Sequence, residues 1–195
     1  ICMYINLLRT SISHALTNAG FRVNGNMMHH YCTCARCDDS AVPRAFIRAV
    51  DQFEERFDED IEIKLKELQL SSAILEQPGV VIGIMREMCD VKHKSPWGLL
   101  VAYSSFINHL CVRQAKSDRP LKRLTLELLL FEVMVEPALD KVMIDLKEAG
   151  GWSAFAQEFP PPSPSTIQKS NWFMRAIQLL GLRLIGESSY VMILK

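Results

Sequence analysis

The sequence has no excess of charge of either sign and no stretch in which Lys and Arg gather. Over 195 residues, 22 basic side chains are balanced by 22 acidic ones. A protein that binds nucleic acid by neutralising its phosphates normally carries clustered Lys and Arg. We therefore expect no nucleic-acid partner.

Motifs of the common catalytic sites are missing as well. The chain has no Gly-rich loop to cradle a phosphate, no Gly-x-Ser-x-Gly elbow and no helical pair of metal-binding histidines. His14 and His109 fall within predicted helices, where a histidine is more often packed or solvated than catalytic. We expect that the protein is not an enzyme and holds no cofactor.

The N-terminal stretch lacks the features of a secretory signal. It begins at Ile1, and residues 2–8 are too short and have no basic leader. An intracellular protein is therefore expected. Its six cysteines then predict mainly reduced thiols, because a chain of this size that is 49% hydrophobic does not need a disulfide framework.

One group of potential metal ligands stands out, the segment "HHYCTCARC" from His29 to Cys37. Histidine and cysteine are the side chains that zinc prefers. The spacing Cys-x-Cys-x-x-Cys, however, does not match a common two-pair zinc finger. We predict a solvated loop without a metal, and zinc binding is the alternative.

Apolar residues three and four positions apart recur almost throughout the chain, which is typical of helices. The helices predicted before residue 90 cover residues 3–19, 40–57 and 80–88, with a shorter and less regular apolar group over 61–70. Gly20 is placed to end the first helix, Ser40 to cap the second, and Pro78 precedes the last. The fold class is therefore all-α.

The stretch "SPWGLLVAYSSFINHLCV", residues 95–112, carries no formal charge and is apolar on nearly every face. Such a helix is either buried at the centre of a bundle or spans a membrane. The next segment, residues 121–135, is rich in Leu but also charged, and Pro137 ends or kinks it. We predict a helical bundle around a buried central hydrophobic hairpin formed by these two segments.

The octapeptide "EAGGWSAF", residues 148–155, interrupts the helical pattern with two glycines. Gly150 is suited to the positive φ that closes a preceding helix. Gly151 has no side chain to block the approach of a neighbouring helix, and Trp152 and Phe155 are expected to bury large rings on the core. A tight corner between two helices is predicted here.

Three segments resemble, in chain order, motifs of the Bcl-2 family of apoptosis regulators. "FIRAVDQF" over 46–53 resembles the third homology motif, "PWGLLVA" over 96–102 the first, and "EAGGWSAF" over 148–155 the second. The resemblance implies a Bcl-2-like helical domain over residues 1–159, with a hydrophobic groove that receives the amphipathic death-motif helix of another member.

The resemblance also implies two sets of binding residues, besides the second-motif corner of Gly150, Gly151, Trp152 and Phe155. The death-motif helix of this chain carries Phe46, Ala49, Val50, Asp51 and Phe53. The residues expected to line the groove are Phe53, Phe57, Ile61, Ile84, Met88, Trp97, Gly98, Leu99, Ala102, Phe106 and Phe159. The expected partners are death-motif helices of Bcl-2 relatives, in a homo- or heterodimer.

One departure from the family pattern concerns ligand recognition. Leu99 stands where the first motif normally has the arginine that pairs with the ligand's Asp, so ordinary ligands are expected to bind more weakly. Arg86, Lys92 or Lys94 are near the same corner in sequence and are candidates for the missing role.

Residues 160–170 read as a Pro/Ser linker and residues 171–195 as an amphipathic or anchor-like helix. Phe173, Ile177, Leu180 and Leu184 share one face, which favours docking on the protein or on a membrane interface. Arg175, Arg183 and Glu187 oppose spontaneous membrane spanning.

The resemblance implies a cytoplasmic regulator of apoptosis that acts at the mitochondrial outer membrane. Whether it protects or kills stays open. The alternatives are a degenerate helical scaffold with a filled or inert groove and a zinc-binding helical protein.

Overall fold

The computed structural model describes residues 1–23, 41–67, 74–90, 95–117 and 121–159, and all regular structure within them is helical. The predicted all-α fold class is confirmed. The helices are α1 (Cys2–Asn18), α2 (Ala41–Glu67), the 3-10 turn η3 (Ile74–Glu76), α3 (Pro78–Asp90), α4 (Pro96–Ala115), α5 (Arg123–Val135), α6 (Pro137–Glu148) and α7 (Gly151–Glu158).

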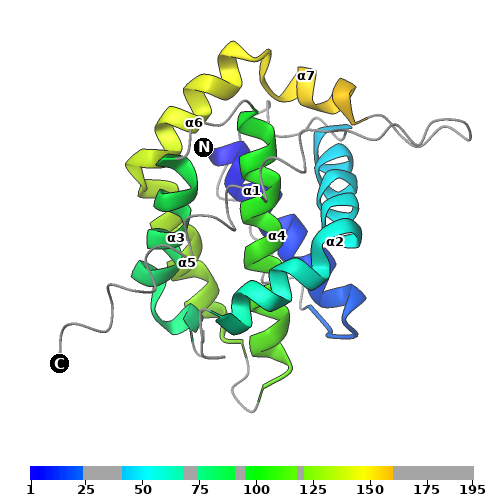
Figure 1. The fold of residues 1–195 in the computed structure, drawn as a ribbon, viewed down its shortest axis with the longest axis vertical. Coiled ribbons are helices and arrows are strands. Elements are labelled where there is room, and N and C mark those ends of the chain that lie inside the picture. The colour runs from blue at the N-terminus through cyan, green and yellow to red at the C-terminus, as the bar shows by residue number, and fades with distance from the viewer. Residues whose placement is uncertain (24–40, 68–73, 91–94, 118–120, 160–195) are drawn as a thin grey trace, which may run out of the picture.

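α4 lies at the centre of the bundle, as its uncharged sequence predicts. α1 and α2 pack against one side of it, α3 and α6 approach the other, and α5 lies beyond α3 (Figure 1). Ser95 caps the first turn of α4 by accepting a hydrogen bond from the backbone N–H of Gly98 at 3.3 Å. Among the described helices, none is long and apolar enough to span a membrane.

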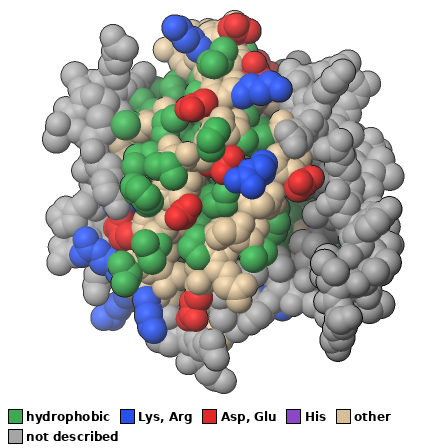
Figure 2. Space-filling view, turned by 90° about the vertical axis from the view of Figure 1, so that its left-hand side faces the viewer, with side chains coloured by type: hydrophobic (Ala, Val, Ile, Leu, Met, Phe, Trp, Pro, Cys, Tyr) green, Lys and Arg blue, Asp and Glu red, His purple; other side chains and the backbone are tan. Residues whose placement is uncertain are grey.

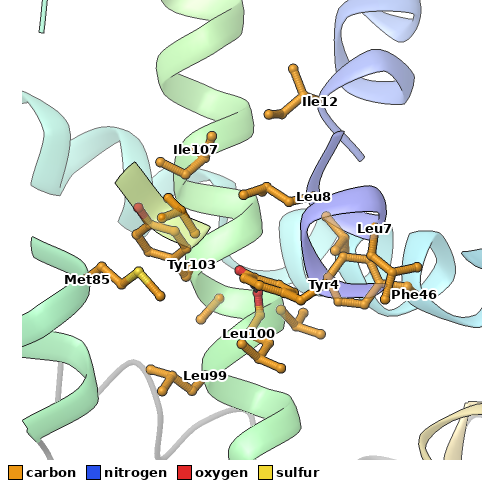
Figure 3. Close-up of a cluster of buried hydrophobic side chains, with 14 of the residues drawn as sticks. Tyr4, Leu7, Leu8, Ile12, Phe46, Met85, Leu99, Leu100, Tyr103 and Ile107 are labelled. Atoms are coloured by element: carbon orange, nitrogen blue, oxygen red, sulfur yellow. Dashed lines mark hydrogen bonds between the residues drawn. The ribbon is translucent and has the colours of Figure 1, made fainter. Parts of the chain in front are cut away.

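α1 is joined to α4 by apolar packing and by one buried polar contact. The Tyr4 hydroxyl lies 3.3 Å from the carbonyl oxygen of Leu100 and 3.2 Å from the hydroxyl of Ser104. Figure 3 shows Tyr4 between the two helices, among Leu7, Leu8 and Leu100. Burial raises the pKa of the Tyr4 hydroxyl well above its ordinary value, so it stays a neutral donor.

α1 ends as its sequence predicts. Gly20 has a φ of 88° and its N–H donates to the carbonyl of Thr17, while the N–H of Phe21 donates to Leu16. These two bonds form a Schellman motif, in which glycine takes the left-handed position that other residues adopt with strain. The signal in the sequence was the glycine directly after the last apolar position.

α2 is longer than the sequence predicted. The helix expected to end near Phe57 and the separate apolar group over 61–70 form one helix that ends at Glu67. Phe57, Ile61 and Leu65 continue the four-residue spacing, and no Gly or Pro lies between them. The acidic residues in this stretch lie mostly on the solvent side and so do not end the helix.

α5 also differs from the expected half of a central hairpin. It packs mainly against α3 and α1, and only one of its faces contributes to the core. A partly buried ion pair joins it to α1: Nη2 of Arg9 lies 2.8 Å from Oε2 of Glu127. α4 alone therefore holds the central position.

The face of α3 that meets the core can be tested with two adjacent valines. Val81 is fully buried, whereas Val80 is 42% exposed. Val81→Ala is expected to lower the free energy of unfolding by about 1.5–3 kcal/mol, because it removes two buried methyl groups and leaves a cavity. Val80→Ala is the matched control, with an expected loss below about 1 kcal/mol. Urea denaturation followed by circular dichroism measures both, and equal losses would contradict the assigned face.

Candidate functional site

Five aromatic side chains from three helices meet around Phe155, which is completely buried. We call this group the aromatic hub. The ring centroids nearest to that of Phe155 are those of Phe159 at 4.8 Å, Phe46 at 5.8 Å, Trp152 at 5.9 Å and Trp97 at 6.1 Å. Tilted and edge-to-face pairs of this kind contribute roughly 0.5–1.5 kcal/mol each beyond their buried area. The hub thus fixes α2, α4 and α7 to one another.

The corner before α7 is formed by two glycines in the left-handed region. Gly150 has φ 97° and closes α6, as predicted, and Gly151 has φ 68°. The expectation that Gly151 makes room for a neighbouring helix was wrong, because a Cβ there would meet nothing within 4 Å. The close approach is at Gly150, where a Cβ would lie 2.7 Å from that of Ala154. At Gly151 the positive φ, rather than a close contact, favours glycine.

A hydrogen bond from α2 reaches the end of α7. Nη2 of Arg48 donates to the backbone carbonyl of Phe159, at 2.6 Å. That carbonyl ends a helix, where the partial negative charge of the helix dipole favours a guanidinium. No local pattern predicts this contact, since Arg48 looks like an ordinary polar position within the segment that resembles a death motif.

The segment that resembles a death-motif helix is part of the protein's own core. Phe46, Ala49, Val50 and Phe53 are all essentially fully buried within the bundle. Asp51 is on the outer side, where its Oδ1 lies 3.1 Å from Nε2 of His14. The hydrophobic anchors of α2 are therefore not available to a partner in this conformation.

Most residues expected to line a groove are covered. The eleven expected residues fall into two classes. The buried ones are Phe53, Phe57, Met88, Gly98, Leu99, Ala102 and Phe159, and the partly buried ones are Ile61, Ile84, Trp97 and Phe106. Both classes come from α2, α3, α4 and the end of α7. The structure brings these residues to neighbouring helices, but in this conformation it uses most of them as core.

Of the three basic residues considered for the arginine that Leu99 replaces in the resemblance, only Arg86 lies among the described residues. Leu99 is buried. Arg86 is engaged in a two-pronged ion pair with Glu136, with Nη2–Oε2 at 2.9 Å and Nε–Oε1 at 3.3 Å. Lys92 and Lys94 lie outside the described residues.

The Arg86–Glu136 pair holds the corner between α5 and α6 against α3. Glu136 is both the C-cap of α5 and the N-cap of α6. As the N-cap, its Oε1 accepts a hydrogen bond from the N–H of Ala138 at 3.2 Å. The hydrogen bonds from Arg86 hold the pKa of this carboxyl below its ordinary value of 4.5. Sequence reasoning missed the pair because the two residues are fifty positions apart.

A polar cavity of about 660 Å³ lies among α1, α2 and α4. Its acidic wall is formed by Glu54, Asp58 and Glu62, four residues apart on α2, and the last two lie 3.5 and 3.4 Å from the ring nitrogens of His109. Asn108 donates to Glu54 at 3.0 Å, and burial raises the pKa of Glu54. The four-residue spacing of the acids was the sequence signal for this wall, which we did not predict.

Within the described ranges, no group of three or more His, Cys, Asp and Glu side chains is arranged to hold a metal ion. The His29–Cys37 cluster lies outside those ranges, as do the linker over 160–170 and the predicted tail helix over 171–195. A scan of the chain against protein-family models gives no match, and neither does a search of curated proteins.

Gly150→Ala tests the corner before α7. The variant is expected to lose at least about 1–2 kcal/mol of stability, because alanine is strained at positive φ and its Cβ would meet that of Ala154. Gly83→Ala within α3 is the control: a Cβ there meets nothing within 4 Å, and a gain of about 0.5–1 kcal/mol is expected. Thermal unfolding compares the two, and an unchanged Gly150→Ala midpoint would contradict the geometry.

Glu136→Gln tests whether the Arg86–Glu136 ion pair stabilises the protein. Because the pKa of Glu136 is lowered by folding, the pair stabilises the protein fully above pH 4.5 and loses this effect as the pH falls further. The variant should therefore be less stable than the parent at pH 7, and the difference should narrow towards pH 3. Glu148→Gln, at an exposed carboxyl of α6, serves as the control. A difference that stays constant between the two pH values would show that the pair does not contribute.

Proposed function

We propose that the protein is a regulator of apoptosis of the Bcl-2 type, which binds amphipathic death-motif helices of its relatives in a hydrophobic groove and acts at the mitochondrial outer membrane. The observation that carries the proposal is the aromatic hub. Phe46, Trp97 and the pair Trp152 and Phe155 come from the three segments that resemble the family's motifs, and all meet at one point. Segments separated by about fifty residues each thus form a single structural unit.

The second support is the central α4, which carries no formal charge from Pro96 to Val112 and is surrounded by the other helices of the bundle. A groove beside such a helix is lined with apolar side chains, and an amphipathic helix binds there through anchors at i, i+3 or i+4, and i+7. Ile61, Ile84, Trp97 and Phe106, the partly exposed members of the expected set, are where a partner helix would first make contact.

Binding of this kind requires the covered residues to be released. A protein that populates its open form only in part binds with an affinity reduced by that fraction. The closed arrangement therefore acts as a control on binding, because a ligand has to replace contacts that the bundle makes with itself.

The burial of most of the expected groove residues also favours one alternative, a scaffold whose groove is filled and inert. The observation on its side is that seven of the eleven expected groove residues are buried. The two proposals differ in a single measurable property, which is whether any death-motif helix binds.

A peptide of residues 41–57 of this chain is a probe of defined sequence, since it carries the death-motif pattern. We expect it to bind the full chain, and we expect the Asp51→Ala peptide to bind within about threefold of it, because Leu99 offers no charge to the aspartate. In a site with a pairing arginine the same change would weaken binding roughly tenfold or more. A Phe53→Glu peptide is the control for the hydrophobic anchors and should bind at least about tenfold more weakly.

Fluorescence anisotropy of labelled peptides measures all three affinities, and peptides from the death motifs of Bcl-2 relatives extend the panel. Absence of binding by every peptide would reject the proposal in favour of the inert scaffold. Strong dependence on Asp51 would show that another basic residue replaces the missing arginine.

A further inference from the structure

α5 is apolar on two opposite faces. Its inner face packs on the core through Leu126, Leu129, Leu130 and Val133. On the outer face, four large hydrophobic side chains stay exposed, and we call them the outer stripe: Leu124 (69% exposed), Leu128 (48%), Phe131 (52%) and Val135 (52%). Figure 2 looks onto the side of the molecule with α3, α5 and α6, where hydrophobic side chains spread between charged ones.

The outer stripe has the spacing of a helix–helix seam. Its members are four, three and four residues apart, which is the repeat of the apolar positions that meet in a two-stranded coiled coil. Single exposed hydrophobic residues are ordinary, but a continuous row along one helix indicates a surface that another element covers. The element that fits such a row is a helix with the same repeat.

The chain contains one such segment among the residues that the structure does not describe. Phe173, Ile177, Leu180 and Leu184 are also four, three and four residues apart, so this tail stripe has the same repeat and the same length as the outer stripe. As a helix, both stripes would extend over roughly 16 Å. No part of the described bundle offers a second exposed row of this length on one helix.

The chain connection selects one direction of pairing. In an antiparallel pair Phe173, the first residue of the tail stripe, meets Val135, at the end of α5 from which the chain runs through α6 and α7 to the linker.

The parallel direction is disfavoured by distance. It would bring Phe173 to Leu124, at the far end of α5, which adds roughly 16 Å to the path that the linker has to cover.

The linker is long enough for this arrangement. Residues 160–172 span up to roughly 45 Å when extended. The path from the C-terminal end of α5 to Phe159 runs through α6 and α7, whose 12 and 8 residues together measure roughly 30 Å. The start of the tail stripe can therefore reach Val135, which is where the antiparallel pairing begins.

We propose that residues 171–187 form a helix that docks antiparallel on the outer stripe of α5. The outer stripe is thereby a binding surface of the protein for its own C-terminal segment, separate from the groove residues discussed above. This inference does not depend on the proposed function, because it follows from α5 and the tail alone.

Hydrogen exchange of the full chain, read by mass spectrometry, tests the docking directly. Amides of residues 173–187 are expected to exchange at least about tenfold more slowly than in a free peptide of the same sequence. Phe131→Glu should return them to the free rate. Ile144→Glu, a change at an equally exposed residue of α6 outside the stripe, is the matched control and should leave the protection unchanged. Leu124→Glu provides a second variant of the stripe, and circular dichroism confirms that each variant is folded.

Protection that survives Phe131→Glu and Leu124→Glu would place the tail elsewhere, such as in the groove, and would overturn the proposal.

A tail that exchanges freely in solution would overturn the proposal too, whether or not phospholipid vesicles then protect it. Binding of the 41–57 peptide, measured in the Phe131→Glu variant, is expected to be unchanged. A failure of the docking and a failure of the proposed function are therefore observed separately.

Discussion

The fold depends on covering a helix that has no charged face. From Pro96 to Val112, α4 carries no formally charged side chain, so exposing any side of it to water is unfavourable and every side needs a neighbour. Two polar side chains on its buried surface have partners on the surrounding helices: Ser104 is contacted by Tyr4 of α1, and Asn108 donates to Ser11 of α1 and Glu54 of α2. Apolar packing thus drives the assembly, and these hydrogen bonds connect α1 and α2 to defined positions along α4.

The same constraint links folding to recognition. The apolar surfaces that would bind a partner helix are also the surfaces that stabilise the closed bundle, and the hydrophobic effect does not distinguish the two uses. At the aromatic hub, Phe155 contacts rings from α2 and α4, and Arg48 ties α2 to the carbonyl of Phe159. A ligand helix therefore competes with contacts inside the chain, and affinity is set by the difference between the two sets of contacts rather than by either one alone.

Sequence reasoning reached the features that a local pattern determines. The burial of α4 follows from its lack of charge, the end of α1 from Gly20, and the end of α6 from Gly150. It did not reach features that depend on which element covers which face. Periodic apolar residues on α2 indicated a buried side but not whether a groove or a core would bury it, and the Arg86–Glu136 pair joins positions that only the tertiary fold brings together. Continuity of α2 was missed because a dense acidic stretch weakens the apolar signal without breaking the helix.

On α5 the apolar pattern alone does not show which side faces the core, because hydrophobic residues lie on two opposite sides of the helix. The partly buried ion pair between Arg9 and Glu127 contributes to the choice, since it needs α1 beside α5. The outer stripe then remains for another helix, and connectivity favours a segment of the same chain. A short linker holds its segment at an effective concentration of about millimolar, so even a weak pairing of two amphipathic helices is largely formed. A separate molecule would need a comparable concentration, or a much higher affinity, to displace it.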